Sequence, residues 1–528
     1  MQSYARGPQR TVVRKTIGEA FLETANRFAE RMALISRAQN VRLTWAEYAH
    51  QARRVAAGLR ALGLRPGDRA GVWATNCAEW PIIQFGCALG GVVLVNVNPA
   101  NRSHELSFVL RKSRMRALFL HTQDRRSNYQ SILEESRAGQ TLPLEHIVYL
   151  DSARWNNFLR DPDGVTAYPD PDEPANIQYT SGTTGQPKGV LLTHVNLVNN
   201  ARFFAEYMRL TEQDRACIPV PMFHCFGSVI GTMTAAVSGA ACIFPTATFD
   251  PAATLEAIDA EQVTVIYGVP TMFIAELQCP EFAHFQLKSL RTGIMAGAPC
   301  PIEIMRRVID TMHCHHMLVV YGQTEASPGI TSSRVDDDLE TRCTTVGGAL
   351  PETEVRIVSP AGETLPAGEQ GELVARGYMV MKGYDGEPEA TTQAVDADGW
   401  LHTGDLAVMR PDGYFKITGR ARDMIIRGGE NVYCVEVETA LIEHPLVRDV
   451  GVLGLPHPEY GEVVACVVQH SADAGETGEA ESTLREHLEA KLAKFKIPTR
   501  FVFTTDDLPR TATGKLLKRE MRTKHFSG

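Results

Sequence analysis

The segment YTSGTTGQPKGV at residues 179–190 has the composition of a phosphate-binding loop. Glycines let backbone N–H groups curl around phosphate oxygens, and hydroxyl and lysine side chains add further donors. The spacing differs from a Walker A loop, because Lys188 is followed by Gly189 rather than by Ser or Thr. A flexible surface loop is the alternative, but the apolar residues on both sides favour a loop between core strands. The candidate phosphate contacts are Thr180, Ser181, Gly182, Thr183, Thr184, Gly185 and Lys188.

A second segment, YGQTE at 321–325, combines an aromatic ring with a carboxylate. Tyr321 offers a flat face to a base, and Glu325 offers the hard oxygen that a magnesium ion prefers. Asp405 follows a glycine at a predicted strand edge, where a carboxylate can accept hydrogen bonds from two neighbouring hydroxyls. Either acidic residue alone would be an ordinary loop carboxylate, so its interpretation depends on the surrounding motifs.

These motifs resemble those of the adenylate-forming enzymes, the superfamily of acyl-CoA synthetases, peptide-synthetase adenylation domains and luciferases. The resemblance covers nearly the whole chain, since the motifs follow one another in family order. After residues 179–190 they are PMFHCFG (221–227), GAP (297–299), YGQTE (321–325), HTGD (402–405), GRARDMIIRGGENV (419–432) and PRTATGK (509–515).

The resemblance implies a nucleotide site built from several of these motifs. Thr184 and Glu325 would place Mg²⁺ on the ATP phosphates, and Asp405 would bind the ribose hydroxyls. The backbone of the GAP motif would lie against adenine. The remaining residues expected at this site are Gly297, Ala298, Pro299, Gly322, Gln323 and Thr324.

The same resemblance assigns roles near the C-terminus. Lys515 is the expected catalytic cation, because a fixed positive charge stabilises the negative charge that builds on phosphate oxygens in the transition state. Arg420 would contact the ribose and Arg422 would be the hinge about which a small domain rotates. Gly428 and Gly429 would line the tunnel for the pantetheine arm of coenzyme A, where a narrow chain passes close to backbone.

The carboxylic acid is less well defined by the sequence. By family position the acyl pocket is lined near Met222, His224, Val229, Gly231, Tyr267 to Thr271 and Ile294 to Ala296. Most of these residues are apolar or small, and no Asp is evident to hold an amino group. His224 is included among the catalytic candidates, although this position more often marks the pocket mouth than a general base. The motifs look most like those of medium-chain fatty acyl-CoA synthetases, while long-chain fatty acids and bulky aryl or terpenoid acids stay open.

The hydrophobic pattern predicts an α/β fold. Thr44 and Glu47 form a capping box before a helix that should end at Gly63, and apolar strands at 70–74 and 92–96 flank a helix at 78–89. Such strand–helix–strand units indicate parallel sheets covered on both faces. We expect an N-terminal ATP- and acyl-binding domain (1–419) with a barrel-like antiparallel part (345–419), a hinge (420–423) and a mobile α+β domain (424–528), with 471–483 as a surface loop.

Composition limits the remaining possibilities. The net charge of −9 disfavours nucleic acid and anionic membranes as partners, and eleven scattered cysteines are typical of reduced thiols in a cytoplasmic protein. The spacing of His313, Cys314, His315 and His316 fits no zinc pattern. The predicted partners are ATP, Mg²⁺, coenzyme A and a small carboxylic acid, without a stable membrane anchor. A homodimer, delivery to a carrier protein, luciferase-like oxidation, a non-catalytic AMP-binding role and membrane attachment are the alternatives.

Overall fold

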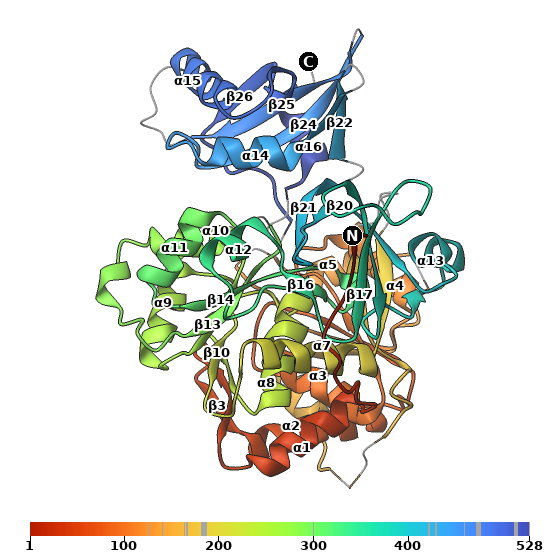
Figure 1. Cartoon of the computed structure of the whole chain (residues 1–528). Helices are drawn as coiled ribbons and strands as arrows, with labels where there is room; N and C mark the ends of the chain where they lie inside the picture. The colour runs from red at the N-terminus through yellow and green to blue at the C-terminus, as the bar shows by residue number, and fades with distance from the viewer. Residues whose placement is uncertain are drawn as a thin grey trace.

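The computed structural model describes residues 1–125, 127–139, 141–162, 164, 167–180, 187–298, 300–420, 423–427, 430–458, 460–470, 477–511 and 516–526. Two parallel-rich sheets with helices form the body of the chain, an antiparallel sheet lies beside them, and a smaller α+β unit follows (Figure 1). The predicted fold class is confirmed by this architecture. None of the helices among the described residues combines the length and the hydrophobicity that a membrane span requires.

The first sheet carries the ends of the 179–190 segment. Its central strands are parallel and pair β8 with β5, β5 with β4 and β4 with β6, while β9 runs antiparallel to β8. In spatial order the strands are β19 (Gly383–Tyr384), β9 (Lys188–Thr193), β8 (Pro174–Thr180), β5 (Val93–Asn96), β4 (Arg69–Trp73), β6 (Ala117–Leu120) and β7 (His146–Tyr149).

The second sheet carries the YGQTE and GAP segments. Its core strands β10 to β14 are parallel, so their carboxyl ends meet at one edge of the sheet, where ligands bind in open α/β sheets. The spatial order is β16 (Gly348–Ala349), β15 (Gly329–Ser332), β14 (His316–Gly322), β13 (Thr292–Ala296), β12 (Val265–Gly268), β10 (Arg215–Cys217), β11 (Ala241–Phe244), β2 (Met32–Ser36) and β3 (Val41–Thr44).

Helices cover both sheets of the body. The capping box predicted at Thr44 and Glu47 starts α2, and Gly63 follows the end of this helix with φ of +81°, as expected for a helix stop. The helices are α1 (Ile17–Arg27), α2 (Trp45–Ala61), α3 (Glu79–Gly90), α4 (Ser103–Ser113), α5 (Tyr129–Arg137), α6 (Ala153–Phe158), α7 (His194–Tyr207), α8 (Thr232–Ser238), α9 (Pro251–Ala260), α10 (Pro270–Leu277), α11 (Ile302–Asp310), α12 (Leu339–Thr344) and α13 (Pro388–Ala394).

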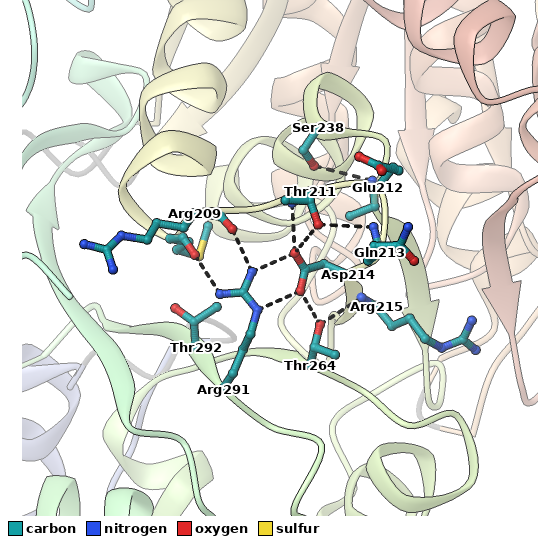
Figure 2. A network of polar contacts seen from close by, with 12 residues as sticks. Arg209, Thr211, Glu212, Gln213, Asp214, Arg215, Ser238, Thr264, Arg291 and Thr292 are labelled. Carbon is teal, nitrogen blue, oxygen red and sulfur yellow. Dashed lines mark hydrogen bonds and ion pairs between the residues drawn. The ribbon is translucent and has the colours of Figure 1, made fainter.

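One ion pair, whose carboxylate is buried, ties the second sheet to the end of α7. The Arg291 guanidinium donates hydrogen bonds to both oxygens of the buried Asp214 carboxylate, at 2.9 and 2.6 Å (Figure 2). The same guanidinium donates to the carbonyls of Met208 and Arg209, just beyond α7, and Thr264 donates to Asp214. The starts of β10, β12 and β13 are thereby fastened together, which fixes the opposite ends of these strands where the site lies.

The antiparallel sheet includes a strand from the N-terminus. Tyr4–Arg6 (β1) pairs with β17, about 350 residues further along the chain, a pairing that sequence periodicity could not reveal. The order is β1, β17 (Thr353–Val358), β18 (Gln370–Gly377), β20 (Leu401–Met409) and β21 (Phe415–Arg420).

The C-terminal unit (blue in Figure 1) lies above β20 and β21. Its strands, in order, are β23 (Glu430–Tyr433), β22 (Met424–Arg427), β25 (Gly461–Gln469) and β24 (Asp449–His457), and β26 (Arg500–Thr504) pairs with β25. Its helices are α14 (Cys434–Ile442), α15 (Thr477–Glu489) and α16 (Lys518–Phe526). The division of the chain into domains at 420–423 stays a prediction, and residues 421–422 lie outside the described part.

The predicted surface loop at 471–483 is wrong in its second half. Helix α15 begins at Thr477 and ends at Glu489, followed by a short 3₁₀ turn at Lys494–Lys496. Glycine, serine and threonine made the segment look like a loop. Ala480, Leu484 and Leu488 are nevertheless buried at helical spacing, so packing against the sheet outweighs the weak local propensity.

Candidate functional site

The two ends of the predicted phosphate loop lie side by side in the first sheet. Thr180 ends β8, Lys188 begins β9, and these two residues are direct partners in the antiparallel ladder. The strands therefore hold both ends of a short connection at one point. Ser181, Gly182, Thr183, Thr184 and Gly185 lie outside the described residues, so their predicted contacts with phosphate stay a prediction.

Glu325 lies next to this loop. Its carboxylate Oε1 accepts a hydrogen bond of 2.9 Å from the Tyr384 hydroxyl, and the Thr180 hydroxyl approaches the same oxygen at 3.5 Å. Lys188 Nζ lies 4.9 Å from the centroid of the Tyr384 ring, within cation–π range. Segments far apart in the sequence thus bring a carboxylate, a hydroxyl and a cation to the same place.

Tyr384 is the functional candidate that sequence reasoning missed. It contacts Lys188 through its ring and Glu325 through its hydroxyl, and burial together with the Glu325 charge raises its pKa, so the hydroxyl stays a donor. Tyr384 belongs to β19, a two-residue strand that pairs with β9. No spacing rule links this residue to Glu325 or to Lys188. The contacts arise only in the folded chain, where β19 pairs with β9 and the Tyr384 hydroxyl reaches Glu325.

Asp405 is held in a fixed orientation by two neighbours. The Tyr321 hydroxyl donates to Oδ2 at 2.8 Å, and Arg420 Nε lies 2.8 Å from Oδ1. Asp405 is only 4% exposed, yet each oxygen has a second lone pair for another donor. Asp405 and Arg420 are cross-strand partners in β20 and β21, so the antiparallel sheet sets their distance. Three predicted nucleotide residues are thereby brought together.

The GAP and YGQTE segments follow neighbouring parallel strands. Ala296 pairs with Val320, so Gly297 and Ala298 lie near Tyr321 at the carboxyl edge of the sheet. Gly297 has φ of +86°, which favours glycine. At Gly322 a Cβ atom would lie 1.8 Å from the Pro328 carbonyl oxygen, so no other residue fits there. Pro299 lies outside the described residues, whereas Gln323 directly precedes a short 3₁₀ turn, Thr324–Ala326, that contains Glu325.

His224 lies on the loop before a π-helical turn, η1 (Phe226–Gly231). Its Nδ1 accepts from the Phe226 N–H at 3.2 Å, and burial lowers its pKa to about 4, so the ring is neutral near pH 7. The Cys225 Sγ lies 4.0 Å from the Thr324 hydroxyl, which places this loop beside YGQTE. A neutral ring with an engaged Nδ1 suits a lining residue better than a strong base.

The apolar residues expected around the acid share one buried cluster. Met222, Val229, Tyr267, Ile294 and Ala296 all belong to it. Gly231 has no room for a side chain, since a Cβ would lie 2.9 Å from Ile218. These side chains expected around the acid are therefore buried and mostly apolar, and the Tyr267 hydroxyl is bonded to Thr234 at 3.1 Å.

Several predicted residues of the C-terminal unit lie outside the described part of the chain. They are Arg422, Gly428, Gly429 and Lys515. The base of the PRTATGK loop is described: Arg510 forms a bridge with Leu516 and pairs with Asp449 at 2.6 Å. The residues on both sides of this connection are therefore held on the small unit, and the position and role of Lys515 stay a prediction.

The expectation that residues 313–316 form no zinc site stays a prediction. Among the residues that the structure describes, no group of three or more His, Cys, Asp or Glu side chains could hold a metal ion. Cys314 is buried against apolar neighbours, and His316 begins β14. All eleven cysteines are free thiols.

The chain belongs to the AMP-binding enzyme family. The family model for AMP-binding enzymes matches residues 21–385, and the model for the AMP-binding enzyme C-terminal domain matches residues 436–515. The resemblance inferred from the motifs is thus confirmed, and the protein is an AMP-forming acid–thiol ligase.

Individual relatives support the same class. A putative acyl-CoA synthetase of Bacillus subtilis, YngI, is 44% identical, with 97% of each chain covered. The human mitochondrial medium-chain acyl-CoA ligase ACSF2 is 38% identical over 98% of this chain and 89% of its own. Among solved structures, the anthranilate CoA ligase AuaEII in complex with anthranoyl-AMP aligns with a TM-score of 0.88 at 27% identity, covering 97% of both chains.

Proposed function

We propose that the protein activates a medium-chain fatty acid with ATP as the acyl-adenylate and transfers the acyl group to coenzyme A, releasing AMP and pyrophosphate. The observation that carries the choice of acid is the character of the side chains expected around it, since Met222, Val229, Tyr267, Ile294 and Ala296 are all buried in the hydrophobic core. None of these side chains offers a carboxylate or ammonium group to pair with a charged substituent on the acid. The human relative, a mitochondrial medium-chain acyl-CoA ligase, supports the same choice.

In the first half-reaction the substrate carboxylate attacks the α-phosphorus of ATP, and pyrophosphate leaves. Asp405 would accept hydrogen bonds from the ribose hydroxyls with its free lone pairs, while Tyr321 and Arg420 hold it in place. The Tyr321 hydroxyl is tied to Asp405, so the orientation of the ring against adenine and the position of the ribose are set together. Lys515 would supply the cation at the reacting phosphate.

The residues around Glu325 fit a magnesium ion. A carboxylate and nearby threonine hydroxyls are the hard oxygen donors that Mg²⁺ uses together with substrate phosphates. Glu325 would be the protein ligand with Thr184, and Tyr384 would orient its carboxylate from the other side. The bound ion would neutralise charge on the phosphates. Lys188, whose Nζ lies over the Tyr384 ring, would add a second positive charge near them.

In the second half-reaction the thiol of coenzyme A attacks the acyl carbonyl, and AMP leaves. We propose that the C-terminal unit rotates about Arg422, which withdraws Lys515 and brings Gly429 to the site. Among the described residues, Gln370 Nε2 donates a hydrogen bond to the Tyr433 hydroxyl, and the Tyr433 ring lies near Gly419. Two units of one chain are expected to move relative to each other unless their interface is large and apolar.

Bulky aromatic acids are the second candidate substrate class. The observation in their favour is the likeness to the anthranilate CoA ligase, a structure solved with an aromatic acyl-adenylate. The rings of Phe226 and Tyr267 lie next to each other, with centroids 6.2 Å apart, and an aryl ring of the acid could pack against them. Delivery to a carrier protein instead of coenzyme A is the other alternative.

The test is acid-dependent release of pyrophosphate from ATP, followed by CoA-dependent release of AMP. Fatty acids of about six to twelve carbons should be the best substrates and should turn over fully only with CoA. Benzoate and anthranilate serve as the matched aromatic panel. Preference for the aromatic acids would overturn the proposed substrate class, and turnover that ignores CoA would overturn the proposed acceptor.

A further inference from the structure

Three buried amide side chains, from strand β5, helix α3 and the connection between β4 and α3, hold the His224 loop, which follows β10 of the second sheet. They are Asn76, Gln84 and Asn96, which are 7%, 7% and 3% exposed. Each side chain bonds main-chain atoms of the segment 218–228. We name this set the amide clamp.

Asn76 and Asn96 hold the segment just before His224. Asn76 Nδ2 donates to the Val220 carbonyl at 2.9 Å, and its Oδ1 accepts from the Met222 N–H at 2.8 Å. Asn96 Nδ2 donates to the Phe223 carbonyl at 3.1 Å. The peptide on the amino side of His224 is therefore fixed by the other sheet.

Gln84 holds the segment just after His224. Its Nε2 donates to the Ser228 carbonyl at 2.8 Å, and its Oε1 accepts from the Thr232 hydroxyl at 2.9 Å. Ser228 in turn donates through Oγ to the His224 carbonyl at 3.1 Å, and Asn96 Nδ2 lies 3.5 Å from the same Oγ. The His224 peptide is thus held on both sides.

The clamp continues to the strand that carries the phosphate loop. Asn176 Nδ2 donates to Asn96 Oδ1 at 2.9 Å, and Gln178 Nε2 donates to Asn176 Oδ1 at 2.7 Å. Both residues lie in β8, which ends at Thr180 beside Glu325. An unbroken series of buried amide hydrogen bonds therefore connects the ATP side of the site to the loop expected to line the acid.

Such a series is more than the fold alone requires. Burying an amide side chain is unfavourable unless its hydrogen bonds are satisfied, and apolar residues of similar volume would pack the same interface. The amide groups instead specify one position for one loop, because hydrogen bonds depend on direction as well as distance.

We propose that Asn76, Gln84 and Asn96 are positioning residues that fix the His224 loop relative to the phosphate strand and thereby set the acyl selectivity. This inference rests on the proposed function. When the clamp is loosened, His224 and Met222 can shift, and the boundary of the acid pocket becomes less defined. The nucleotide contacts at Asp405 and Tyr321, on other elements, stay in place.

The test compares Asn96→Leu with Asn199→Leu as the matched control. Asn199 is also fully buried and also bonds main chain, donating to the Val13 and Val195 carbonyls at 2.9 and 2.8 Å, but it fastens the N-terminal segment. Both variants should lose a similar amount of thermal stability. Only Asn96→Leu should raise KM for the preferred acid about tenfold, while its KM for ATP should change less than twofold. The same variant should also distinguish less strongly between fatty acids of different chain length.

A second variant keeps the proposal testable if Asn96→Leu fails to fold. Ser228→Ala removes only the hydroxyl between Asn96 and the His224 carbonyl, and it should raise KM for the acid by about threefold in the same selective way. If a variant changed KM for the acid and KM for ATP equally, or left the dependence of activity on fatty-acid chain length unchanged, the proposed role of the amide clamp would be wrong. A wild-type protein without acid-dependent pyrophosphate release would instead overturn the proposed function itself.

Discussion

The hydrogen bond between Tyr384 and Glu325 leads to a testable prediction about the use of ATP and magnesium. Tyr384→Phe removes the hydroxyl that donates to Glu325 Oε1 at 2.9 Å, but keeps the ring beneath Lys188 Nζ. A hydrogen bond to a charged group contributes roughly 1.5 kcal/mol or more, and 1.4 kcal/mol corresponds to a factor of about ten. We therefore expect kcat/KM for ATP to fall roughly tenfold.

The assay is the initial rate of acid-dependent pyrophosphate release, titrated separately with ATP and with MgCl₂. Because the freed carboxylate is less well oriented for the ion, half-saturation with magnesium should move to higher concentration. Tyr414→Phe is the matched control, since the Tyr414 hydroxyl donates to Asp337 at 2.8 Å in another part of the chain.

A Tyr384→Phe enzyme with wild-type dependence on ATP and magnesium would refute this reasoning. Tyr384 would then only cover Glu325, without orienting it. Tyr384→Leu separates the two contacts further: it should be worse than the phenylalanine variant only if the cation–π contact with Lys188 also contributes.

Three further predictions concern chemistry and stability. Lys515→Ala should cripple adenylation but leave thioester formation from supplied acyl-AMP largely intact, and equal loss in both half-reactions, measured separately, would contradict its role. Arg291→Ala should lower the free energy of unfolding by roughly 3 kcal/mol in urea titrations, because Asp214 stays buried without its partner; a loss under 1 kcal/mol would contradict this. Burial lowers the pKa of His194 to about 4, so its contribution to stability is present above pH 6.5 and lost as pH falls toward 4. His194→Asn should remove up to about 1.4 kcal/mol per pH unit from the slope in that window, and an unchanged slope would argue against a neutral buried ring.

Local features of the fold were predictable because their signals are local. The capping box at Thr44 and Glu47 and the apolar strands at 70–74 and 92–96 depend on residues a few positions apart. The pairing of β1 with β17 depends on contacts between distant segments, and the helix at Thr477 depends on packing of its apolar face. These features are set by tertiary structure, which outweighs local propensity.

The residues of the site also fall into those that the sequence could reveal and those that it could not. Motif residues such as Glu325 and Asp405 could be selected because a carboxylate at that spacing resembles a known pattern. Tyr384 could not, because its partner is 59 residues away and its own surroundings carry no chemical signature. The amide clamp could not be predicted either, because the role of Asn96 depends on its hydrogen bond to the carbonyl of Phe223, a residue far away in the sequence.

The most direct test of the central claim is pyrophosphate release from ATP over a panel of carboxylic acids, each with and without coenzyme A. We predict release that depends on the acid, is greatest for fatty acids of medium length, and continues through many turnovers only when coenzyme A is present. Release that is independent of the acid, or absent with every acid of the panel, would contradict the assignment of this site to acyl-adenylate formation and transfer.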